Sequence, residues 1–482
     1  PRALAGVLVV LAVAAVVAPP PAQAAGRFVD VPSGNVHLAN IDSLAAAGMK
    51  FTRAYSGNAV CAPSRCVLMT GKHPGHAFIR NNGEVKPEGQ RPIPAAEVTL
   101  AEVLKGRGYA TGAFGKWGLG SPGSEGDPIH QGFDRFYGYN CQRHAHSYYP
   151  GYLWSDLKRV KLNNNPPVPG HASLAKGADP SDPESYERFK GTDYAPDRIN
   201  EQVLKFVRQN RDKPFFLYYP TIIPHVALHV PDEELKPYLA LEWPDPPFTR
   251  AKGYGYTPHF TPRAAYAAMI TRMDHYIGNL LSLLEELKLS DNTIVIFSSD
   301  NGTTHLRAEV DHEFFNSVGK LRGLKGSLYE GGIRVPMIVR WPGKVAAGST
   351  SDRIVGFEDL LPTLGKIGGG DIPEGLDGID FTPTLLGKSQ PSRPFLYREF
   401  SGYGGQQSVH FGKWKAVRQK LHKRKAKGPV KIKTELYDLE KDPAEKHDVA
   451  DENPQVVARA RKLFAEQHTR SQLFPIRALD GR

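Results

Sequence analysis

The sequence predicts an α/β protein with a mostly parallel central sheet flanked by helices, followed by a smaller C-terminal α+β subdomain. Short, fully apolar segments such as residues 214–219 (PFFLYY) and 293–297 (TIVIF) are typical of strands that are buried on both faces. They alternate with helix-like stretches, of which residues 262–287 form the longest amphipathic example. Strands that alternate with helices favour a parallel sheet, which carries its functional loops at the carboxyl ends of the strands.

Local signals justify a further helix and strand. Residues 99–102 (TLAE) resemble a capping box, which predicts that a helix begins there. Gly106 and Gly108 are expected to end this helix, because glycine readily adopts the backbone conformation that terminates helices. Residues 109–114 then predict a strand that enters the loop at Gly115.

The pattern changes after about residue 360. Short strands, a basic run and a last helix at residues 454–467 replace the alternation of long strands and helices. We therefore expect a main α/β unit at residues 25–360 and a smaller subdomain at residues 361–482.

The composition narrows the class of protein. The chain has 482 residues, of which 40% are hydrophobic and 23% charged, and this excludes both intrinsic disorder throughout and a polytopic membrane protein. Three cysteines, Cys61, Cys66 and Cys141, are too few for a disulfide framework.

The net charge of +11 is local rather than general. Residues 413–433 contain ten Lys or Arg and no acid, so the rest of the chain carries a net charge of only +1. A single basic run is weak evidence for nucleic-acid binding, and no nucleic-acid partner is expected. It predicts either a solvated, partly disordered loop or a patch that attracts anions.

The first residues predict export. An unbroken apolar run at residues 3–18 follows Arg2, and small residues at positions 22 and 24 suit a cleavage site. This pattern is typical of a secretory signal peptide, here residues 1–24. The alternative is a membrane anchor, but the run is short for a spanning helix, which needs about 20 apolar residues. We expect an exported protein, periplasmic or extracellular, without stable membrane insertion.

The most specific local pattern is residues 61–65 (CAPSR), followed by Thr70 and Gly71. A thiol at the start of a helix, close to an arginine, is typical of a nucleophile beside an anion-binding cation. The alternative is a buried structural cysteine.

This motif resembles the signature of the sulfatase family, C-x-P-S-R with a downstream T-G. Further motifs similar to those of the family follow in family order, at residues 40–45, 48–52, 115–120 (GKWGLG), 224–225 (PH), 299–302 (SDNG), 323–326 (GLKG), 329–332 (YEGG) and 436–443. The resemblance covers residues 28–465 and implies an alkaline-phosphatase-like fold with a sulfatase catalytic domain at residues 25–360.

The resemblance also implies the chemistry. In sulfatases a maturation enzyme oxidises the motif cysteine, here Cys61, to the aldehyde formylglycine. The hydrated aldehyde attacks sulfur, and its second hydroxyl later expels sulfate. By resemblance, Arg65 holds the hydrated aldehyde, Lys116 and Lys325 bind sulfate oxygens, and His225 protonates the leaving alcohol. Cys66 is then a packing residue.

The resemblance further implies one divalent cation, usually calcium, held by Asp300 and Asn301. Asn301 also begins a glycosylation sequon, a reading we reject because a buried ligand cannot carry a glycan. His144 and His146 have the spacing of a metal pair on a strand, but no further Cys or His cluster supports zinc. Gln142 or His144 could instead contact the sulfate or the substrate.

A second histidine-containing pair, Asp274 and His275, lies on the long amphipathic segment. A role in packing or at the helix surface is favoured there over a role in metal binding.

The chain departs from the family in two places. Gly118 stands where many sulfatases have a second active-site histidine. The family's first strand, which ends in an Asp-Asp pair that binds the metal, is missing from the expected position, and Asp30 is a single candidate substitute. We therefore expect a sheet without one interior strand and a cation with too little carboxylate charge.

The expected function is hydrolysis of an aryl or carbohydrate sulfate monoester by an exported enzyme. One alternative is a degenerate homologue that binds sulfated glycans. Another is a phosphoesterase of the same superfamily, but such enzymes use Ser or Thr and two metals with several His and Asp ligands, and neither feature is found here.

Overall fold

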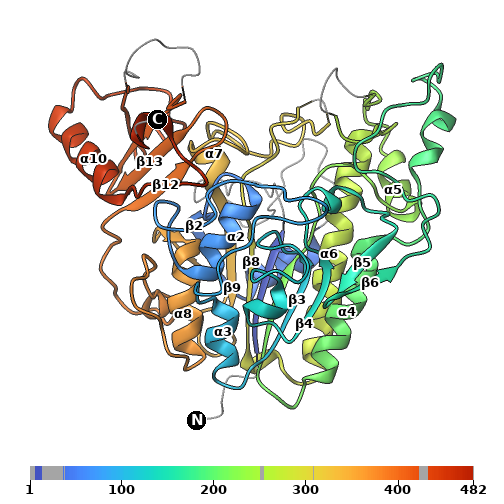
Figure 1. Cartoon of the computed structure of the whole chain (residues 1–482), viewed down its shortest axis with the longest axis horizontal. Coiled ribbons are helices and arrows are strands. Elements are labelled where there is room, and N and C mark those ends of the chain that lie inside the picture. The colour runs from blue at the N-terminus through green and yellow to red at the C-terminus, as the bar shows by residue number, and fades with distance from the viewer. Residues whose placement is uncertain are drawn as a thin grey trace.

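The chain folds around one large sheet, with a small second sheet near its C-terminus (Figure 1). The computed structural model describes the backbone of residues 6–12 and, in full, residues 36, 38–249, 255–307, 309–422 and 432–480.

Within these residues, eleven strands form the large sheet, in the order β10-β2-β9-β8-β1-β7-β3-β4-β5-β6, with β11 also paired to β2. Their bounds are β1 Gly6–Ala12, β2 Met49–Tyr55, β3 Ala110–Lys116, β4 Arg135–Tyr139, β5 Tyr152–Ser155, β6 Lys158–Lys161, β7 Phe215–Pro220, β8 Thr293–Ser299, β9 Arg334–Arg340, β10 Ser349–Ser351 and β11 Val355–Gly356. The central strands β8, β1, β7, β3 and β4 are parallel, as the sequence predicted.

The strand β7 shows why its sequence is apolar throughout. Phe215, Leu217 and Tyr219 belong to one buried cluster, whereas Phe216 and Tyr218 belong to the cluster on the opposite face. Successive side chains of a strand point to opposite faces, so a strand covered by helices on both sides needs apolar residues at every position.

Helices cover both faces. On one face, α1 (Ala39–Ala46) and α4 (Ala195–Gln209) each contact α6 (Pro262–Glu286). On the other face, α2 (Cys61–Thr70), α3 (Leu100–Lys105) and α8 (Leu360–Ile367) contact one another. The remaining helices are α5 Asp232–Leu239, α7 Glu330–Ile333, α9 Thr382–Leu385, α10 Pro454–Gln467 and α11 Arg477–Asp480. Thr99 forms the predicted capping box with Glu102, and Asp274 accepts hydrogen bonds from the start of α1, which is the packing role expected for it.

The expectation that the sheet lacks an interior strand is wrong. β1 lies between β7 and β8 and pairs in parallel with both, from Gly6 opposite Phe215 and Thr293 onward. The apolar run that reads as a signal peptide therefore fills the central position. Its composition suits that position as well as it suits a signal peptide, because both require a continuous apolar segment. The rest of residues 1–24, and Asp30, lie outside the described residues.

The second sheet is antiparallel, with β12 (Leu396–Phe400), β13 (Gln406–Phe411), β14 (Trp414–Arg418) and β15 (Glu435–Asp438) in sequence order. α10 packs on β13, and Figure 1 shows both at the upper left. Residues of α8 and Leu385 of α9 belong to the apolar cluster on one face of the large sheet, although most of them follow the predicted boundary at residue 361.

The basic run 413–433 is not one solvated loop. Lys415 lies in β14, is buried, and forms ion pairs with Glu330 and Glu445 at 2.8 and 3.0 Å. Lys413 and Lys433 pair with Asp438 and Asp448, each at 2.7 Å, and residues 423–431 lie outside the described residues.

None of the helices in the described part of the chain is long and apolar enough to cross a membrane.

Candidate active site

Four strands bring the predicted site residues to one edge of the large sheet. Cys61 follows β2, Lys116 ends β3, His225 follows β7, and Asp300 follows β8. These strands run in the same direction, so their carboxyl ends meet. The family resemblance selected these residues, and the alternation of strands and helices predicted the edge of the sheet at which their loops lie.

Cys61 lies in the first turn of α2 and is buried. Its Sγ is 3.6 Å from Lys325 Nζ, 3.7 Å from Lys116 Nζ and 3.9 Å from Asn301 Nδ2. The thiol therefore faces two ammonium groups and an amide donor. A group placed at this position meets hydrogen-bond donors on several sides, which suits an anion rather than an apolar ligand.

Arg65 lies one turn further along α2 and is fully buried. Its Nε donates to Asp300 Oδ2 at 2.9 Å, and its Nη1 donates to the backbone carbonyl of Lys116. Asn301 Nδ2 also donates to the Asp300 carboxylate. Arg65 thereby ties α2 to the ends of β3 and β8, and holds two of the residues around Cys61 in place.

Burial affects the charge of these groups. It lowers the pKa of the Lys116 ammonium to about 8, and the nearby charges of Arg65 and Lys325 contribute in the same direction. Burial and the ammonium groups of Lys325 and Lys116 also hold the pKa of His225 well below its ordinary value. His225 is consequently neutral near pH 7 when no anion is bound.

A group of histidines that the sequence did not connect surrounds His225. The His146 ring is stacked on the His225 ring with centroids 4.9 Å apart, and His146 Nδ1 lies 2.8 Å from His171 Nε2. His144 and His146, whose spacing alone would suit a metal pair, therefore have different neighbours. His144 instead contacts Glu88 at 3.2 Å, and both histidines lie on a short 3₁₀ turn rather than on a strand. Only their positions in three dimensions could show this.

Cys61, both lysines and the three histidines His146, His171 and His225 line a pocket of about 400 Å³. Its walls are Val60, Cys61, Asn82, Glu84, Gln90, Lys116, Gln142, Arg143, His146, His171, His225, Val226, Tyr256, Thr304, His305, Leu306, Lys325 and Tyr403.

The expected cation site is incomplete within the described residues. Asn301 is fully buried and its Oδ1 has no hydrogen-bond partner, which suits a metal ligand and also excludes glycosylation of Asn301 in the folded chain. The Asp300 carboxylate, however, already pairs with Arg65. Calcium takes six to eight oxygen ligands, and these two side chains do not provide that set. No step of the chemistry below therefore depends on a cation.

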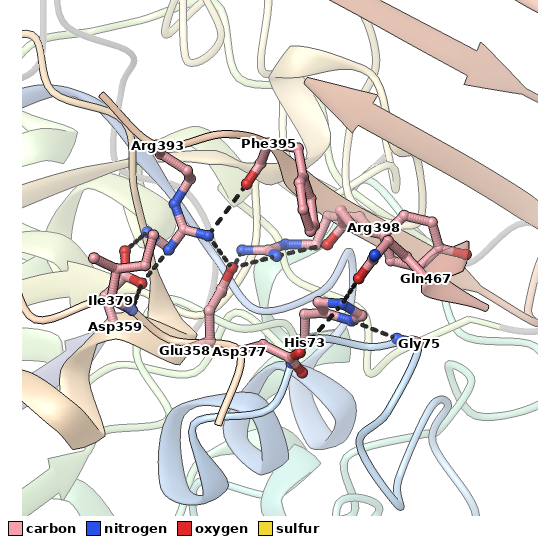
Figure 2. A network of polar contacts seen from close by, with 12 residues as sticks. His73, Gly75, Glu358, Asp359, Asp377, Ile379, Arg393, Phe395, Arg398 and Gln467 are labelled. Atoms are coloured by element: carbon pink, nitrogen blue, oxygen red, sulfur yellow. Dashed lines mark hydrogen bonds and ion pairs between the residues drawn. The ribbon is translucent and has the colours of Figure 1, made fainter. Parts of the chain in front are cut away.

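One cluster of potential metal ligands does occur in the described part of the chain, away from the pocket: His73, His76 and Asp377. Hydrogen bonding accounts for it (Figure 2). His73 Nδ1 accepts from the backbone N–H of Gly75 at 3.1 Å, so the ring proton is on Nε2, which lies 3.0 Å from the Gln467 side-chain oxygen. A protonated Nε2 cannot ligate a metal. We therefore interpret this cluster as part of the packing between the segment that follows α2 and the C-terminal end of α10.

Comparison with known proteins identifies the family of this chain. A profile of the sulfatase family matches residues 27–370, and a profile described as N-sulphoglucosamine sulphohydrolase, C-terminal, matches residues 324–470. The chain belongs to the sulfatase family. Its members hydrolyse sulfuric esters, and the chain is accordingly a sulfatase by descent and fold.

Sulfatases from distant organisms are similar over most of their length. Human arylsulfatase A is 31% identical over 453 residues, covering 88% of this chain and 81% of the relative. The N-acetylgalactosamine-6-O-sulfatase of Bacteroides thetaiotaomicron is 28% identical over 492 residues, covering 90% and 89%. Among solved structures, Ps i-CgsB superposes with a TM-score of 0.73 at 25% identity, covering 96% of this chain and 92% of that one. It has also been solved in complex with k-i-k-neocarrahexaose.

Proposed function

We propose that this sulfatase hydrolyses a sulfate monoester of a carbohydrate or aryl alcohol through a formylglycine made from Cys61. The observation that carries the proposal is the position of Cys61 Sγ, within 3.6–3.9 Å of Lys325, Lys116 and Asn301. A sulfate ester is anionic, and its transition state places more charge on the oxygens around sulfur. Donors held at fixed positions around the nucleophile stabilise that charge.

Formylglycine, once a maturation enzyme has formed it, supplies a hydrated aldehyde as nucleophile and a route for releasing sulfate. The side chains of this chain do the rest. Lys116 and Lys325 bind the sulfuryl oxygens. Arg65 acts as a positioning residue, because its guanidinium is occupied by Asp300 and by the carbonyl of Lys116.

His225 is the proposed general acid. Its Nδ1 lies within hydrogen-bond distance of the backbone carbonyl of Val226 and donates to it, so Nε2 is the nitrogen that can give a proton to the leaving alcohol. The anionic substrate offsets the charges of Lys116 and Lys325, and binding therefore favours the protonated form of His225.

Two observations support a carbohydrate as the alcohol. The similar N-acetylgalactosamine-6-O-sulfatase is named after a saccharide substrate, and the similar structure of Ps i-CgsB was solved with the saccharide k-i-k-neocarrahexaose. The pocket also carries Tyr403, which is 63% exposed, and Tyr256. Exposed aromatic rings with a polar tip suit a ring-shaped, partly apolar and partly hydroxylated ligand.

The proposal is tested on protein that is co-expressed with a formylglycine-generating system. Mass spectrometry of the peptide containing Cys61 should show the loss expected for conversion to formylglycine, and the protein should release sulfate from a small aryl sulfate. Cys61→Ala should abolish turnover without changing the melting temperature. An unmodified Cys61 in active protein would contradict the proposed mechanism.

A second candidate function follows from the incomplete cation site. With only Asp300 and Asn301 as oxygen donors among the described residues, the chain could bind sulfated glycans while turning them over poorly. Tight binding of a sulfated oligosaccharide by formylglycine-containing protein, with no sulfate release at any calcium concentration, would favour this function over hydrolysis.

We also propose that the protein is exported, on the strength of the apolar run at residues 3–18 behind Arg2 and the small residues at positions 22 and 24. The fold adds a constraint, because cleavage after residue 24 would remove β1 from the centre of the sheet. The test is to determine the N-terminal residue of the protein recovered outside the cytoplasm. A chain that begins near residue 25 would show that the segment is a cleaved signal peptide, and a chain that keeps residues 6–12 would show that it stays in the sheet.

A further inference from the structure

One polar side chain in the pocket has no partner. Gln142 is 5% exposed, and neither its Oε1 nor its Nε2 makes a hydrogen bond within the described structure. It lines the same pocket as Cys61, Lys116 and Lys325. A buried amide without partners costs free energy on folding, so its retention beside the reacting group calls for an explanation.

The chain makes specific room for this amide at Gly118. This glycine has a φ of +88°, a conformation that other residues rarely adopt. A Cβ built at this position would overlap Gln142 Nε2 and lie 3.1 Å from its Cδ. Any side chain at position 118 would therefore displace the amide, and the two residues form a matched pair.

The backbone explains why these residues meet. β3 and β4 are parallel, with Lys116 opposite Tyr139. Their pairing continues beyond the strand ends, because the N–H of Trp117 donates to Tyr139 O at 2.8 Å and that of Gly118 donates to Asn140 O at 3.2 Å. Residues 118 and 142 are thus held side by side, two residues after the lysine that contacts Cys61.

We propose that Gln142 is a sulfate-positioning residue, which donates a hydrogen bond from Nε2 to a sulfuryl oxygen of the bound ester. This proposal rests on the proposed function and names a further contact of that same site. The bound sulfuryl group supplies the partner that the amide lacks in the free protein. Being neutral, Gln142 adds a donor without adding to the positive charge of Lys116 and Lys325.

The first test measures binding of inorganic sulfate, by calorimetry and by thermal shift, to the wild type and to Gln142→Leu. The leucine is one atom shorter but has a similar volume, and it removes the unpartnered amide. We expect a melting temperature equal to or higher than that of the wild type, with sulfate bound about 10- to 100-fold more weakly. Gln131→Leu is the control, because Gln131 is equally buried but lies outside the pocket, and it should leave sulfate affinity unchanged.

The second test uses the pairing with Gly118. Gly118→Ala should weaken sulfate binding as Gln142→Leu does, because the new methyl displaces the amide. In a Gln142→Ala background the same change should alter sulfate affinity by less than about threefold, since the space is then free. Additive losses of sulfate affinity in this cycle would overturn the pairing.

The kinetic result separates positioning from packing. If Gln142 holds the sulfuryl group equally in the bound substrate and in the transition state, Gln142→Leu raises KM for an aryl sulfate and leaves kcat nearly unchanged. Gln142→Glu keeps the size but brings a carboxylate to the sulfate, so it should bind more weakly than Gln142→Leu. A Glu variant that binds better than the Leu variant would show that Gln142 only fills space.

The outcomes also distinguish this inference from the proposed function. If the wild type binds sulfate and hydrolyses an aryl sulfate but Gln142→Leu does both equally well, the inference fails and the proposed function stands. If the wild type neither binds sulfate nor hydrolyses the ester, the proposed function fails, and the sulfate-positioning role fails with it.

Discussion

Two of the regions that bury several charges in this molecule differ, because only one of them balances those charges. At the junction of the two sheets, Glu358 accepts hydrogen bonds from Arg398 at 2.8 and 3.0 Å and lies near Arg393, which also pairs with Asp359 (Figure 2). Two carboxylates there face two guanidinium groups.

The pocket around Cys61 has the opposite character. Arg65, Lys116 and Lys325 bring three positive charges, and among the described residues Asp300 alone pairs with any of them. Balanced buried charges join parts of a structure, because each is satisfied within the fold. An excess of one sign is satisfied only by a ligand of the other sign. The difference between these clusters separates a structural role from a binding role without reference to any relative.

The largest expected effect is the loss of both regions together. The pocket is attached to the large sheet through β3, β7 and β8. The junction is attached through β11, which ends at Gly356, two residues before Glu358. A chain that starts at residue 25 lacks β1 and leaves β7 and β8 with unpaired backbone groups. We expect it to be insoluble or unfolded by circular dichroism, whereas the full chain folds. A chain from residue 25 that folds and turns over substrate as well as the full chain would show that β1 is dispensable.

A variant of the full chain tests the cation site at the end of the same strand. Replacing the residues directly after β1 with Asp-Asp should strengthen calcium binding, since affinity depends on the number of ligand charges.

The next largest effect is expected from a substitution in the balanced cluster of Glu358, Asp359, Arg393 and Arg398 alone. Arg398→Met leaves Glu358 buried with too little positive charge, and we expect the free energy of unfolding to fall by about 3–5 kcal/mol in urea titration. Adding Glu358→Gln should recover part of this loss. Turnover per folded molecule should be unchanged, and an equal loss of kcat/KM would contradict the division between the two regions.

The unbalanced cluster should respond in the opposite way. Lys116→Met removes a buried positive charge that lacks a carboxylate partner, so stability should be unchanged or higher. The sulfuryl group loses a charged donor, and kcat/KM should fall about 10²- to 10³-fold. Lys116→Arg, which keeps the charge, serves as the control. A clear drop in melting temperature for Lys116→Met would place this lysine with the structural charges instead.

The smallest effect is a shift in pH dependence. Burial lowers the pKa of Lys116 to about 8, so kcat/KM should fall as the pH rises through about 8 and the ammonium is lost. The pKa of His225 lies below its ordinary value, so the protonated acid becomes more populated, and kcat/KM rises, as the pH falls below 6.5. In the pH profile of kcat, the step that is due to His225 should lie at higher pH than in the profile of kcat/KM, because the bound sulfate ester favours the protonated ring.

The Lys116→Arg variant provides the comparison for the limb at higher pH. It should move that step beyond the measurable range, because the guanidinium stays protonated. A limb that remains near pH 8 in this variant would belong to another group.

The sequence by itself determined the class of fold and the principal site. The apolar strands at residues 214–219 and 293–297, the helix at residues 262–287 and the capping box at Thr99 all appear where local patterns placed them. Cys61, Lys116, His225 and Lys325, selected by family resemblance, line one pocket; the first three lie at the carboxyl ends of strands that run in the same direction, whereas Lys325 comes from the long segment between β8 and α7.

Tertiary structure decided what local patterns could not. An apolar segment such as Gly6–Ala12 suits either a signal peptide or a central strand, and only its pairing with β7 and β8 shows that this one can occupy the centre of the sheet. Lys415 looked like part of a solvated basic run until Glu330 and Glu445, distant in sequence, were placed beside it. Gln142 became significant because Gly118 lies against it and its amide has no hydrogen-bond partner within the described structure. In each case the deciding neighbour is brought close by chain folding, and the local sequence carries no record of it.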